Sequence, residues 1–286
     1  MGVERLRYDG RRALISGGAS GMGAATAKLL TELGAEVHVL DIQDVTFPVA
    51  QAVRVDLRDP AAIDAALERV GGPIHALFSC AGVSGAPFSP LEVMQINFLG
   101  ARHLIERAID EDLMADGSAI AMVSSIGGTG WERNLGQIRE LLATPTYDAA
   151  SKWVTENMAG GPDDDAEFMA MLAYAFSKQV INVYVQLHAV PYIRKGIRIN
   201  ATGPGPTATP LYAATPLWDE YGGSEFREVV GKEPSEPEDQ AYPLVFLNSD
   251  AARYVNGVIV NVDGGVVAGA LLGVYESFLI QPVPDS

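Results

Sequence analysis

The stretch SGGASGMGAATAKLL, from Ser16 to Leu30, follows a short apolar run and opens a helical pattern. Its glycines include Gly17, Gly21 and Gly23. Glycine permits a tight turn and a close backbone approach, and a helix N-terminus offers unpaired N–H groups and a positive dipole end to a pyrophosphate. Taken alone, the glycines are also compatible with a purely structural turn. Their position between a strand and a helix favours a dinucleotide-binding α/β fold.

Short apolar runs alternate with helical patterns along the rest of the chain. The runs are RRALIS, EVHVLD, AVRVD, IHALFSCAG, SAIAMVSS, GIRINATG and GVIVNVDGG. Helices are expected from Gly21 to about Leu33, from Pro60 to Val70 and over a long stretch from Pro90 to Met114. This order predicts a Rossmann-type, doubly wound, seven-stranded parallel sheet with helices on both faces. The 286 residues suffice for one domain, 1–286, with a substantial core.

Three segments depart from this alternation. Residues 128–172 contain two further helical patterns, WERNLGQIRELLA and Tyr147–Met158, which predict a helical insertion. Residues 208–237 are rich in Pro, Gly and aromatics, and we expect a lid there because long irregular segments after strands usually cover a ligand site. The apolar tail 266–286 predicts contact with a partner subunit, and hence a homodimer or homotetramer.

Charge and composition exclude several classes of partner. The formal net charge is −16, from 36 acidic and 20 basic residues, which would repel nucleic acid and anionic membranes. A single cysteine, Cys80, permits no internal disulfide and suits a reducing compartment. The four histidines lack metal-ligand spacing, so no metal is expected. The N-terminus has no apolar signal region, and cytoplasmic residence is the expectation.

Two acidic residues at strand ends bear on the choice of coenzyme. Asp41 ends the second predicted strand, about twenty residues after the glycines, where a carboxylate can accept both ribose hydroxyls and would repel a 2′-phosphate. Gly18 and Ile42 occupy positions where a 2′-phosphate would need Arg or Lys. NAD is therefore favoured over NADP, with a solvated turn aspartate as the alternative. Asp56, after the third strand, is placed to reach the adenine amino group.

Further motifs follow in a fixed order. They are CAG at 80–82, Asn97 in MQINFLGA, Ser124–Ser125, a Tyr-x-x-x-Lys pair, Pro204–Gly205 and VDGG at 262–265. With the glycine turn, they make nearly the whole chain resemble the single-domain branch of the short-chain dehydrogenase/reductase family. The insertion resembles that of bacterial 3α-hydroxysteroid dehydrogenase/carbonyl reductases. Cys80 departs from the family pattern, in which Asn is usual, and we expect it to be a buried packing residue.

Two segments compete for the Tyr–Lys pair, YDAASKW (Tyr147–Trp153) and YAFSKQV (Tyr174–Val180). Helical residues four apart lie about 40° apart around the axis, whereas residues five apart lie about 140° apart. Only Tyr174 and Lys178 can therefore direct both side chains into one site. Tyr174 is also followed by a single helix that leads into GIRINATGPG. The pair of Tyr147 and Lys152 is thus interpreted as a look-alike within the insertion.

The resemblance implies a role for each matching residue. Tyr174 would be the general acid/base, Lys178 would hold the nicotinamide ribose and favour the tyrosinate, and Ser125 would bind the substrate oxygen, with Ser124 as the fallback. Asn97 would hold a water that links Lys178 to solvent. Thr207 and Thr209 would bind the carboxamide, and Thr209 is equally suited to capping the helix that follows. The predicted coenzyme-binding set is Gly17, Ser20, Gly21, Met22, Gly23, Asp41, Ile42, Asp56, Leu57, Cys80, Ala81, Gly82, Tyr174, Lys178, Pro204, Gly205, Thr207 and Thr209.

The resulting functional hypothesis is an NAD-dependent oxidoreductase that interconverts a secondary alcohol and a ketone. A hydroxysteroid or another bulky apolar alcohol is the expected substrate, because apolar and aromatic residues lie in the segments expected to cover the site: Trp131, Leu211, Tyr212, Leu217 and Trp218. Anchoring of a lid or an interface explains the same residues equally well. The alternatives are a small-ketone or 3-oxoacyl reductase and, more remotely, a non-catalytic NAD-binding regulator.

Overall fold

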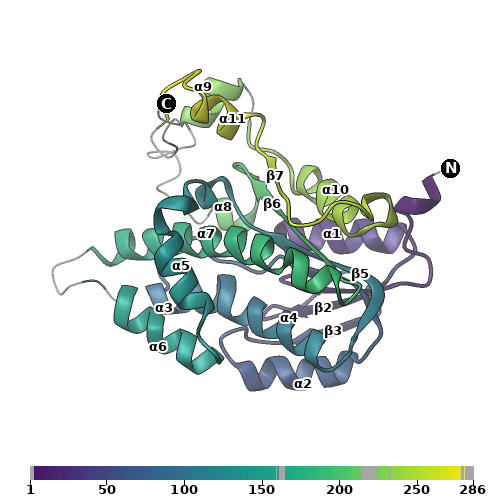
Figure 1. The fold of residues 1–286 in the computed structure, drawn as a ribbon. Coiled ribbons are helices and arrows are strands. Elements are labelled where there is room, and N and C mark those ends of the chain that lie inside the picture. Colours follow the sequence, from purple (N-terminus) through teal and green to yellow (C-terminus); the bar gives the residue numbers. More distant parts are fainter. Residues whose placement is uncertain are drawn as a thin grey trace.

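Seven parallel strands form the centre of the protein, in the order β3-β2-β1-β4-β5-β6-β7 (Figure 1). The structure is a computed structural model that describes residues 3–158, 160, 165–213, 224–231, 233–277 and 280. The strands are β1 (Arg12–Ser16), β2 (Glu36–Asp41), β3 (Gln51–Arg54), β4 (Ile74–Ser79), β5 (Met114–Val123), β6 (Arg198–Pro204) and β7 (Ile259–Val262). The strand order reverses between β1 and β4, where such sheets bind ligands. The predicted fold class is confirmed.

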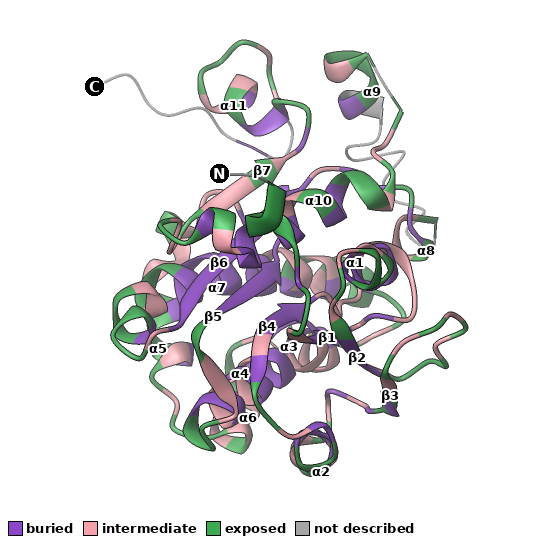
Figure 2. Cartoon of the chain, turned by 90° about the vertical axis from the view of Figure 1, so that its right-hand side faces the viewer, coloured by how far each residue is buried: buried purple, intermediate pink, exposed green. Residues whose placement is uncertain are grey.

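Helices cover both faces of the sheet. Two of them, α1 (Gly21–Glu32) and α10 (Pro237–Asn248), pack together on one face. On the other face lie α2 (Pro60–Val70), α4 (Gly100–Asp110) and α7 (Ala166–Ile193). Successive side chains of a strand point to opposite faces of the sheet. In β1, Ala13 and Ile15 therefore pack into the core under α1 and α10, whereas Leu14 packs into the larger core under α2, α4 and α7. Burial on both faces, visible in Figure 2, explains the continuous apolar runs of the strands.

The expected helix from Pro90 to Met114 is divided and shorter than predicted. Its parts are α3 (Pro90–Met94), a π-helical turn (Gln95–Leu99) and α4, which ends at Asp110. Asp112 adopts a left-handed conformation (φ 55°), which a helix cannot continue through. Met114 therefore begins β5, where the prediction made it the last residue of the helix.

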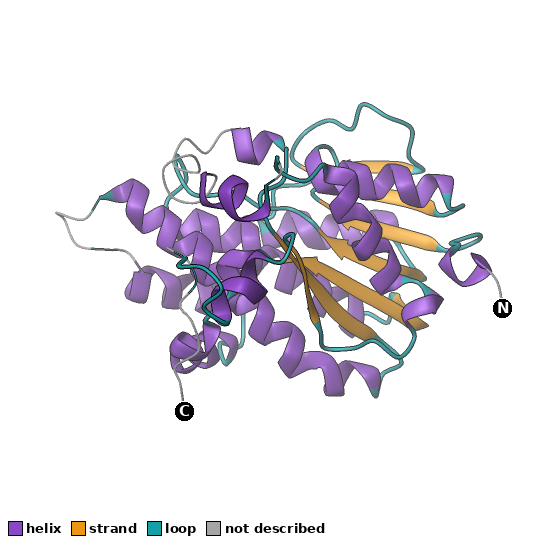
Figure 3. Cartoon of the chain, turned by 90° about the horizontal axis from the view of Figure 1, so that it is seen from above, coloured by secondary structure: helices purple, strands orange, loops and turns teal. Residues whose placement is uncertain are grey.

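Two short helices precede α7. They are α5 (Leu135–Leu142) and α6 (Tyr147–Met158), in agreement with the expected helical patterns. Viewed from above, the strands lie in one half of the molecule, and helices and loops alone make up the other half (Figure 3). Asp165 caps α7 by accepting hydrogen bonds from the backbone N–H groups of Glu167 and Phe168. Residues 166–172, predicted as the end of the insertion, are thus the first turns of the helix that carries Tyr174.

The predicted lid and tail contain three more helices in their described parts: α8 (Pro210–Ala213), α9 (Ser224–Val230) and α11 (Val266–Leu271). Val266, Val267 and Ala270 pack against Phe226 of α9 and Ile126. This part of the tail therefore buries its apolar residues within its own chain, because α9 offers them a partner. Leu217 and Trp218 lie outside the described residues, and the oligomeric state stays a prediction.

Candidate active site

A cavity of about 310 Å³ lies at the carboxyl ends of the central strands. Every residue predicted to bind the coenzyme lines it, as do both Ser124 and Ser125. The strands bring these residues together, because the carboxyl ends of parallel strands meet at one edge of the sheet. Among the described residues, no group of three or more His, Cys, Asp or Glu side chains could hold a metal ion.

The glycine turn leaves the N-terminus of α1 open to the cavity. Ser20, the residue before α1, makes no side-chain capping bond, so the first N–H groups of the helix remain available for an anion. A Cβ atom on Gly23 would lie 2.0 Å from the carbonyl oxygen of Gly17, and one on Gly17 would lie 2.4 Å from the backbone of Ala81. Glycine is required at both positions, and the turn fits a dinucleotide pyrophosphate.

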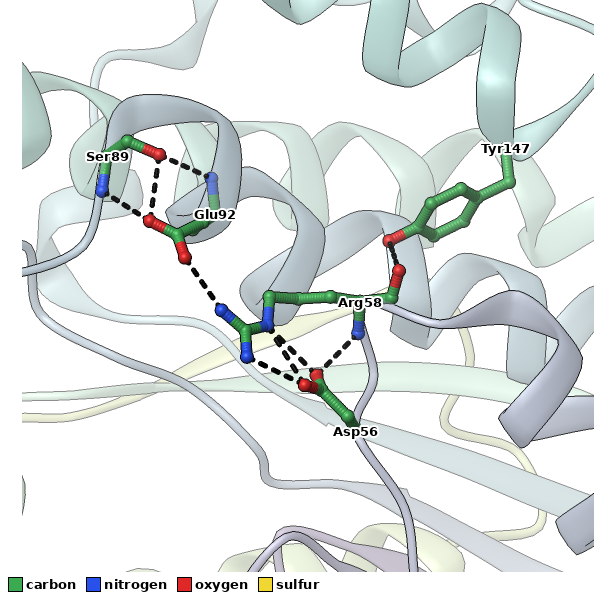
Figure 4. Close-up of polar contacts among 5 residues, drawn as sticks. All are labelled: Asp56, Arg58, Ser89, Glu92 and Tyr147. Atoms are coloured by element: carbon green, nitrogen blue, oxygen red, sulfur yellow. Dashed lines mark hydrogen bonds and ion pairs between the residues drawn. The ribbon is translucent and has the colours of Figure 1, made fainter.

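Asp41 and Asp56 line the same cavity as the glycine turn. Asp41 accepts hydrogen bonds from the backbone N–H groups of Ala19 (2.8 Å) and Gln43 (2.9 Å), which hold its carboxylate beside the glycine turn. Asp56 binds the guanidinium of Arg58, with a shortest N–O distance of 2.7 Å (Figure 4). This hydrogen bonding lowers the pKa of Asp56, so the carboxylate is charged at neutral pH.

Tyr174 and Lys178 face the cavity from one side of α7, as the four-residue step requires. The Nζ atom of Lys178 lies 5.6 Å from the centre of the Tyr174 ring and donates a hydrogen bond to the carbonyl oxygen of Val123 (3.0 Å). Burial lowers the pKa of Lys178 to about 8, opposed by the nearby thiol of Cys80. Burial raises the pKa of Tyr174, and a hydrogen bond from Ser125 lowers it again in part.

The two adjacent serines are used differently. The hydroxyl of Ser124 donates to the carbonyl oxygen of Lys178 (3.1 Å) and so ties β5 to α7. The hydroxyl of Ser125 accepts from the N–H of Gly127 (3.1 Å), which leaves its proton for Tyr174 or a substrate oxygen. Of the two, Ser125 is therefore the residue whose hydroxyl faces the tyrosine.

Asn97 does not line the cavity, and its side-chain amide makes three hydrogen bonds. Its Oδ1 accepts from the N–H of Val83 (2.8 Å), while its Nδ2 donates to the carbonyl oxygen of Val83 (3.0 Å) and the hydroxyl of Ser177 (3.1 Å). Both amide hydrogens are used, so the side chain serves as a clamp between the loop after β4 and α7. The sequence analysis did not predict Val83 and Ser177 as site residues. The only signal for them was their position, since Val83 directly follows CAG and Ser177 lies within YAFSK.

The other candidate pair, Tyr147 and Lys152, does not share a site, as the five-residue spacing predicts. Lys152 is exposed and lies 3.7 Å from Glu156, and neither it nor Tyr147 lines the cavity. The phenol of Tyr147 instead donates to the carbonyl oxygens of Arg58 (3.1 Å) and Leu57 (3.3 Å). Trp131, predicted to cover the site, packs against the large core instead, whereas Leu211 and Tyr212 do line the cavity.

The loop after β6 closes the cavity above the glycine turn. Thr209 accepts from the N–H of Tyr212 (3.2 Å), which caps α8, and its methyl group would touch a Cβ on Gly21 at 3.2 Å. The hydroxyl of Thr207 donates to the carbonyl oxygen of Gly205 (3.0 Å), and Thr207 also lines the cavity. Both predicted carboxamide ligands therefore lie on the wall of the cavity, and Thr209 lies beside Gly21 of the glycine turn.

Comparison with known proteins identifies the family. Residues 11–135 match the short chain dehydrogenase family, and residues 165–267 match a family described as enoyl-(acyl carrier protein) reductase. Cis-4-hydroxycyclohexanecarboxylate dehydrogenase from Sinomonas cyclohexanicum is 31% identical, over 90% of this chain and 97% of its own length. The chain belongs to the short-chain dehydrogenase/reductase family. It is therefore an oxidoreductase.

Two further members of the family extend the likeness. The 3-alpha-hydroxysteroid dehydrogenase/carbonyl reductase of Comamonas testosteroni is 30% identical, over 89% of this chain and 96% of its own length. The structure of the 3-alpha-hydroxysteroid dehydrogenase from Pseudomonas sp. B-0831, complexed with NADH, has a TM-score of 0.74 at 27% identity and covers 93% of this chain and 100% of its own. The resemblance expected for the insertion thus extends to whole chains.

This member of the short-chain dehydrogenase/reductase family accommodates Cys80 without losing the connection between β1 and β4. The backbone N–H of Cys80 donates to the carbonyl oxygen of Ser16 (2.9 Å). Cys80 is half-buried, where a buried residue was expected, and it packs against the core while lining the cavity. Desolvation raises the pKa of the thiol to about 12, so it remains neutral. None of the helices that the structure describes is long and apolar enough to cross a membrane.

Proposed function

We propose that the chain is an NAD-dependent oxidoreductase that interconverts a secondary alcohol and a ketone, with Tyr174 as general acid/base. The observation that carries the proposal is one cavity with two chemically distinct ends. Ser125, Tyr174 and Lys178 form one end. The uncapped N-terminus of α1 and the carboxylate of Asp41 form the other, and residues of both groups line the same cavity.

The choice of NAD rests on Asp41 and its neighbours. A carboxylate beside the glycine turn accepts hydrogen bonds from ribose hydroxyls and repels a 2′-phosphate. Gly18 and Ile42 offer no positive charge to offset that repulsion. The Pseudomonas structure in complex with NADH gives independent support from a related protein.

In the proposed mechanism, a bound nicotinamide ring would take the hydride from the alcohol or return it to the ketone. The chain supplies the proton chemistry and the orientation. A free tyrosine has a pKa of about 10, so acting as a base near neutrality requires about 4 kcal/mol of preferential stabilisation of the phenolate. The ammonium of Lys178 and the hydroxyl of Ser125 supply stabilisation of this kind, against the opposing effect of burial.

Ser125 would hold the substrate oxygen next to the phenol of Tyr174, so that the proton moves along a short hydrogen bond. Lys178 would donate to the nicotinamide ribose, and Thr207 and Thr209 would bind the carboxamide. The clamp of Asn97 on Ser177 keeps this face of α7 in place: Ser177 donates to the carbonyl oxygen of Tyr174 (2.6 Å). In the proposed relay, Asn97 would hold a water through an acceptor oxygen, because both hydrogens of its amide are already used.

The proposed substrate is an alcohol on a bulky apolar ring, such as a hydroxysteroid. Phe88, Leu211 and Tyr212 give the cavity apolar and aromatic walls near its catalytic end. The names of related proteins support this substrate class: they include 3-alpha-hydroxysteroid and cis-4-hydroxycyclohexanecarboxylate dehydrogenases and a cyclohexanol dehydrogenase from Acinetobacter sp.. A small ketone or a 3-oxoacyl thioester is the alternative substrate.

The decisive experiment replaces Tyr174 by Phe. We expect Tyr174→Phe to lose at least a hundredfold in kcat, because it lacks the proton-transferring hydroxyl, while it still binds NADH. Turnover would be measured with NAD and NADP against cyclohexanol, a 3α-hydroxysteroid and a small secondary alcohol. Tyr8→Phe is the control, since Tyr8 is fully buried and its phenol donates to the carbonyl oxygen of Val245 (2.6 Å), away from the cavity. Activity retained in Tyr174→Phe would refute the assignment.

A further inference from the structure

The phenol of Tyr147 contacts the back of the adenosine end of the cavity. Tyr147 begins α6 and lies outside the cavity, yet its hydroxyl reaches the carbonyl oxygen of Arg58 (3.1 Å; Figure 4). It also reaches the carbonyl oxygen of Leu57 (3.3 Å). Burial, with the nearby charge of Asp56, raises the pKa of this phenol, so it remains a hydrogen-bond donor through the neutral range.

The loop that Tyr147 contacts faces the cavity with its other side. Asp56, Leu57 and Arg58 all line the cavity, at the end bounded by Asp41. They follow β3, and their course is fixed by local hydrogen bonds, such as that from the N–H of Arg58 to Asp56 (2.9 Å), together with contacts from neighbouring elements. The phenol therefore touches the backbone of the wall that would receive the adenosine, without touching the cavity itself.

Other contacts hold the same three residues at defined points. A Cβ atom on Gly100 would lie 2.4 Å from the carbonyl oxygen of Leu57, so the loop is pressed closely onto the start of α4. The guanidinium of Arg58 bridges Asp56 and Glu92, both at a shortest distance of 2.7 Å (Figure 4). Glu92 is itself fixed, because it belongs to the capping box that begins α3.

The helix that carries Tyr147 is well anchored, which makes the phenol a fixed point. Ala150 and Val154 of α6 are each 1% exposed. The ring of Trp153 stacks on that of Phe176, with centroids 6.2 Å apart and an interplanar angle of 13°. Phe176 lies two residues after Tyr174, so α6 packs on the catalytic helix at one point and on the adenosine loop at another.

We propose that Tyr147 is a positioning residue for the adenosine half of the coenzyme, acting through the backbone of Leu57 and Arg58. The inference rests on the proposed binding of NAD in this cavity. It gives the segment YDAASK a function of its own: α6 braces the wall of the coenzyme site, and its tyrosine is used for holding a loop.

The test is the Tyr147→Phe variant, with ADP-ribose as the probe. We expect the Kd for ADP-ribose, measured by titration calorimetry, and the KM for NAD to rise together by about three- to tenfold, the usual effect of one lost neutral hydrogen bond. The KM for the alcohol and the kcat at saturating NAD should change less than twofold. A change in the first two quantities alone would show that binding of the adenosine half is weakened. A general loosening of the fold would instead change all four quantities.

Two further variants complete the design. Tyr8→Phe removes a buried phenol that also donates to a backbone carbonyl, and its Kd for ADP-ribose should equal that of the wild type. Gly100→Ala places a Cβ 2.4 Å from the same carbonyl oxygen of Leu57, so it should displace this backbone and weaken ADP-ribose in the same selective way, which keeps the test open if Tyr147→Phe fails to fold. An unchanged Kd in Tyr147→Phe, or equal weakening in Tyr8→Phe, would overturn the inference. A wild-type protein that binds no ADP-ribose would instead overturn the proposed function on which the inference rests.

Discussion

Lys178 should make the stability of the coenzyme-free protein depend on pH in a defined way. Lys178 is only 4% exposed, and this burial lowers the pKa of its amine from 10.5 to about 8. Between these two values, the unfolded chain binds a proton that the folded chain has released. The free energy of unfolding therefore rises with pH across this window, because stability increases wherever the unfolded state holds more protons.

The magnitude follows from the two pKa values. Each pH unit is equivalent to about 1.4 kcal/mol, so burial of the ammonium costs the folded protein about 3 kcal/mol at pH 7 relative to the neutral amine. By pH 9.5 the folded protein holds the amine, and about 2 kcal/mol of this cost has been relieved. In Lys178→Met, which keeps the length of the side chain and lacks the titrating group, this contribution is absent.

The assay is urea denaturation of the wild type and Lys178→Met without coenzyme, at pH 7 and pH 9.5. The wild type should gain about 2 kcal/mol in free energy of unfolding relative to the variant between these pH values. Other groups that titrate in this range are present in both proteins, so they cancel in the difference. In Lys178→Met, the carbonyl oxygen of Val123 loses its hydrogen-bond donor at both pH values, so the cost of this lost bond also cancels when the two pH values are compared. A difference that does not change with pH would refute the claim that Lys178 is desolvated.

Two other substitutions probe the coenzyme end of the cavity. Asp41→Asn should lower the ratio of kcat/KM for NAD to kcat/KM for NADP by at least about tenfold, because it removes the charge that repels a 2′-phosphate and weakens the bonds to the ribose hydroxyls. Initial rates measured in parallel with both coenzymes give this ratio. An unchanged ratio would contradict the role of Asp41. Gly23→Ala should reduce NADH affinity at least about tenfold and lower the free energy of unfolding by about 1–3 kcal/mol, because its Cβ would lie 2.0 Å from the Gly17 carbonyl oxygen. Fluorescence titration and urea denaturation test this against Gly136→Ala in α5, where a Cβ meets nothing within 4 Å and no loss is expected.

Local pattern was sufficient for the fold and for much of the candidate site. Buried parallel strands require continuous apolar runs, and crossover helices require apolar residues with a 3.6-residue period. The order of strands and helices could therefore be predicted from the sequence. The choice of Tyr174 over Tyr147 followed from helical phase and from the order of elements along the chain. The positions of the glycines and of Asp41 likewise depend on neighbours in sequence, and the structure places them on one cavity.

What the sequence could not determine are the contacts between residues far apart in the chain. Tyr147 lies 90 residues from Leu57, and Asn97 lies 80 residues from Ser177, so their hydrogen bonds exist only once helices have packed on the sheet. The same holds for the tail: Val266, Val267 and Ala270 meet α9, a contact that the sequence did not indicate. Periodicity specifies which face of a helix is buried. The neighbour that the face meets, and hence whether a tyrosine performs chemistry or supports a loop, is decided by the tertiary structure.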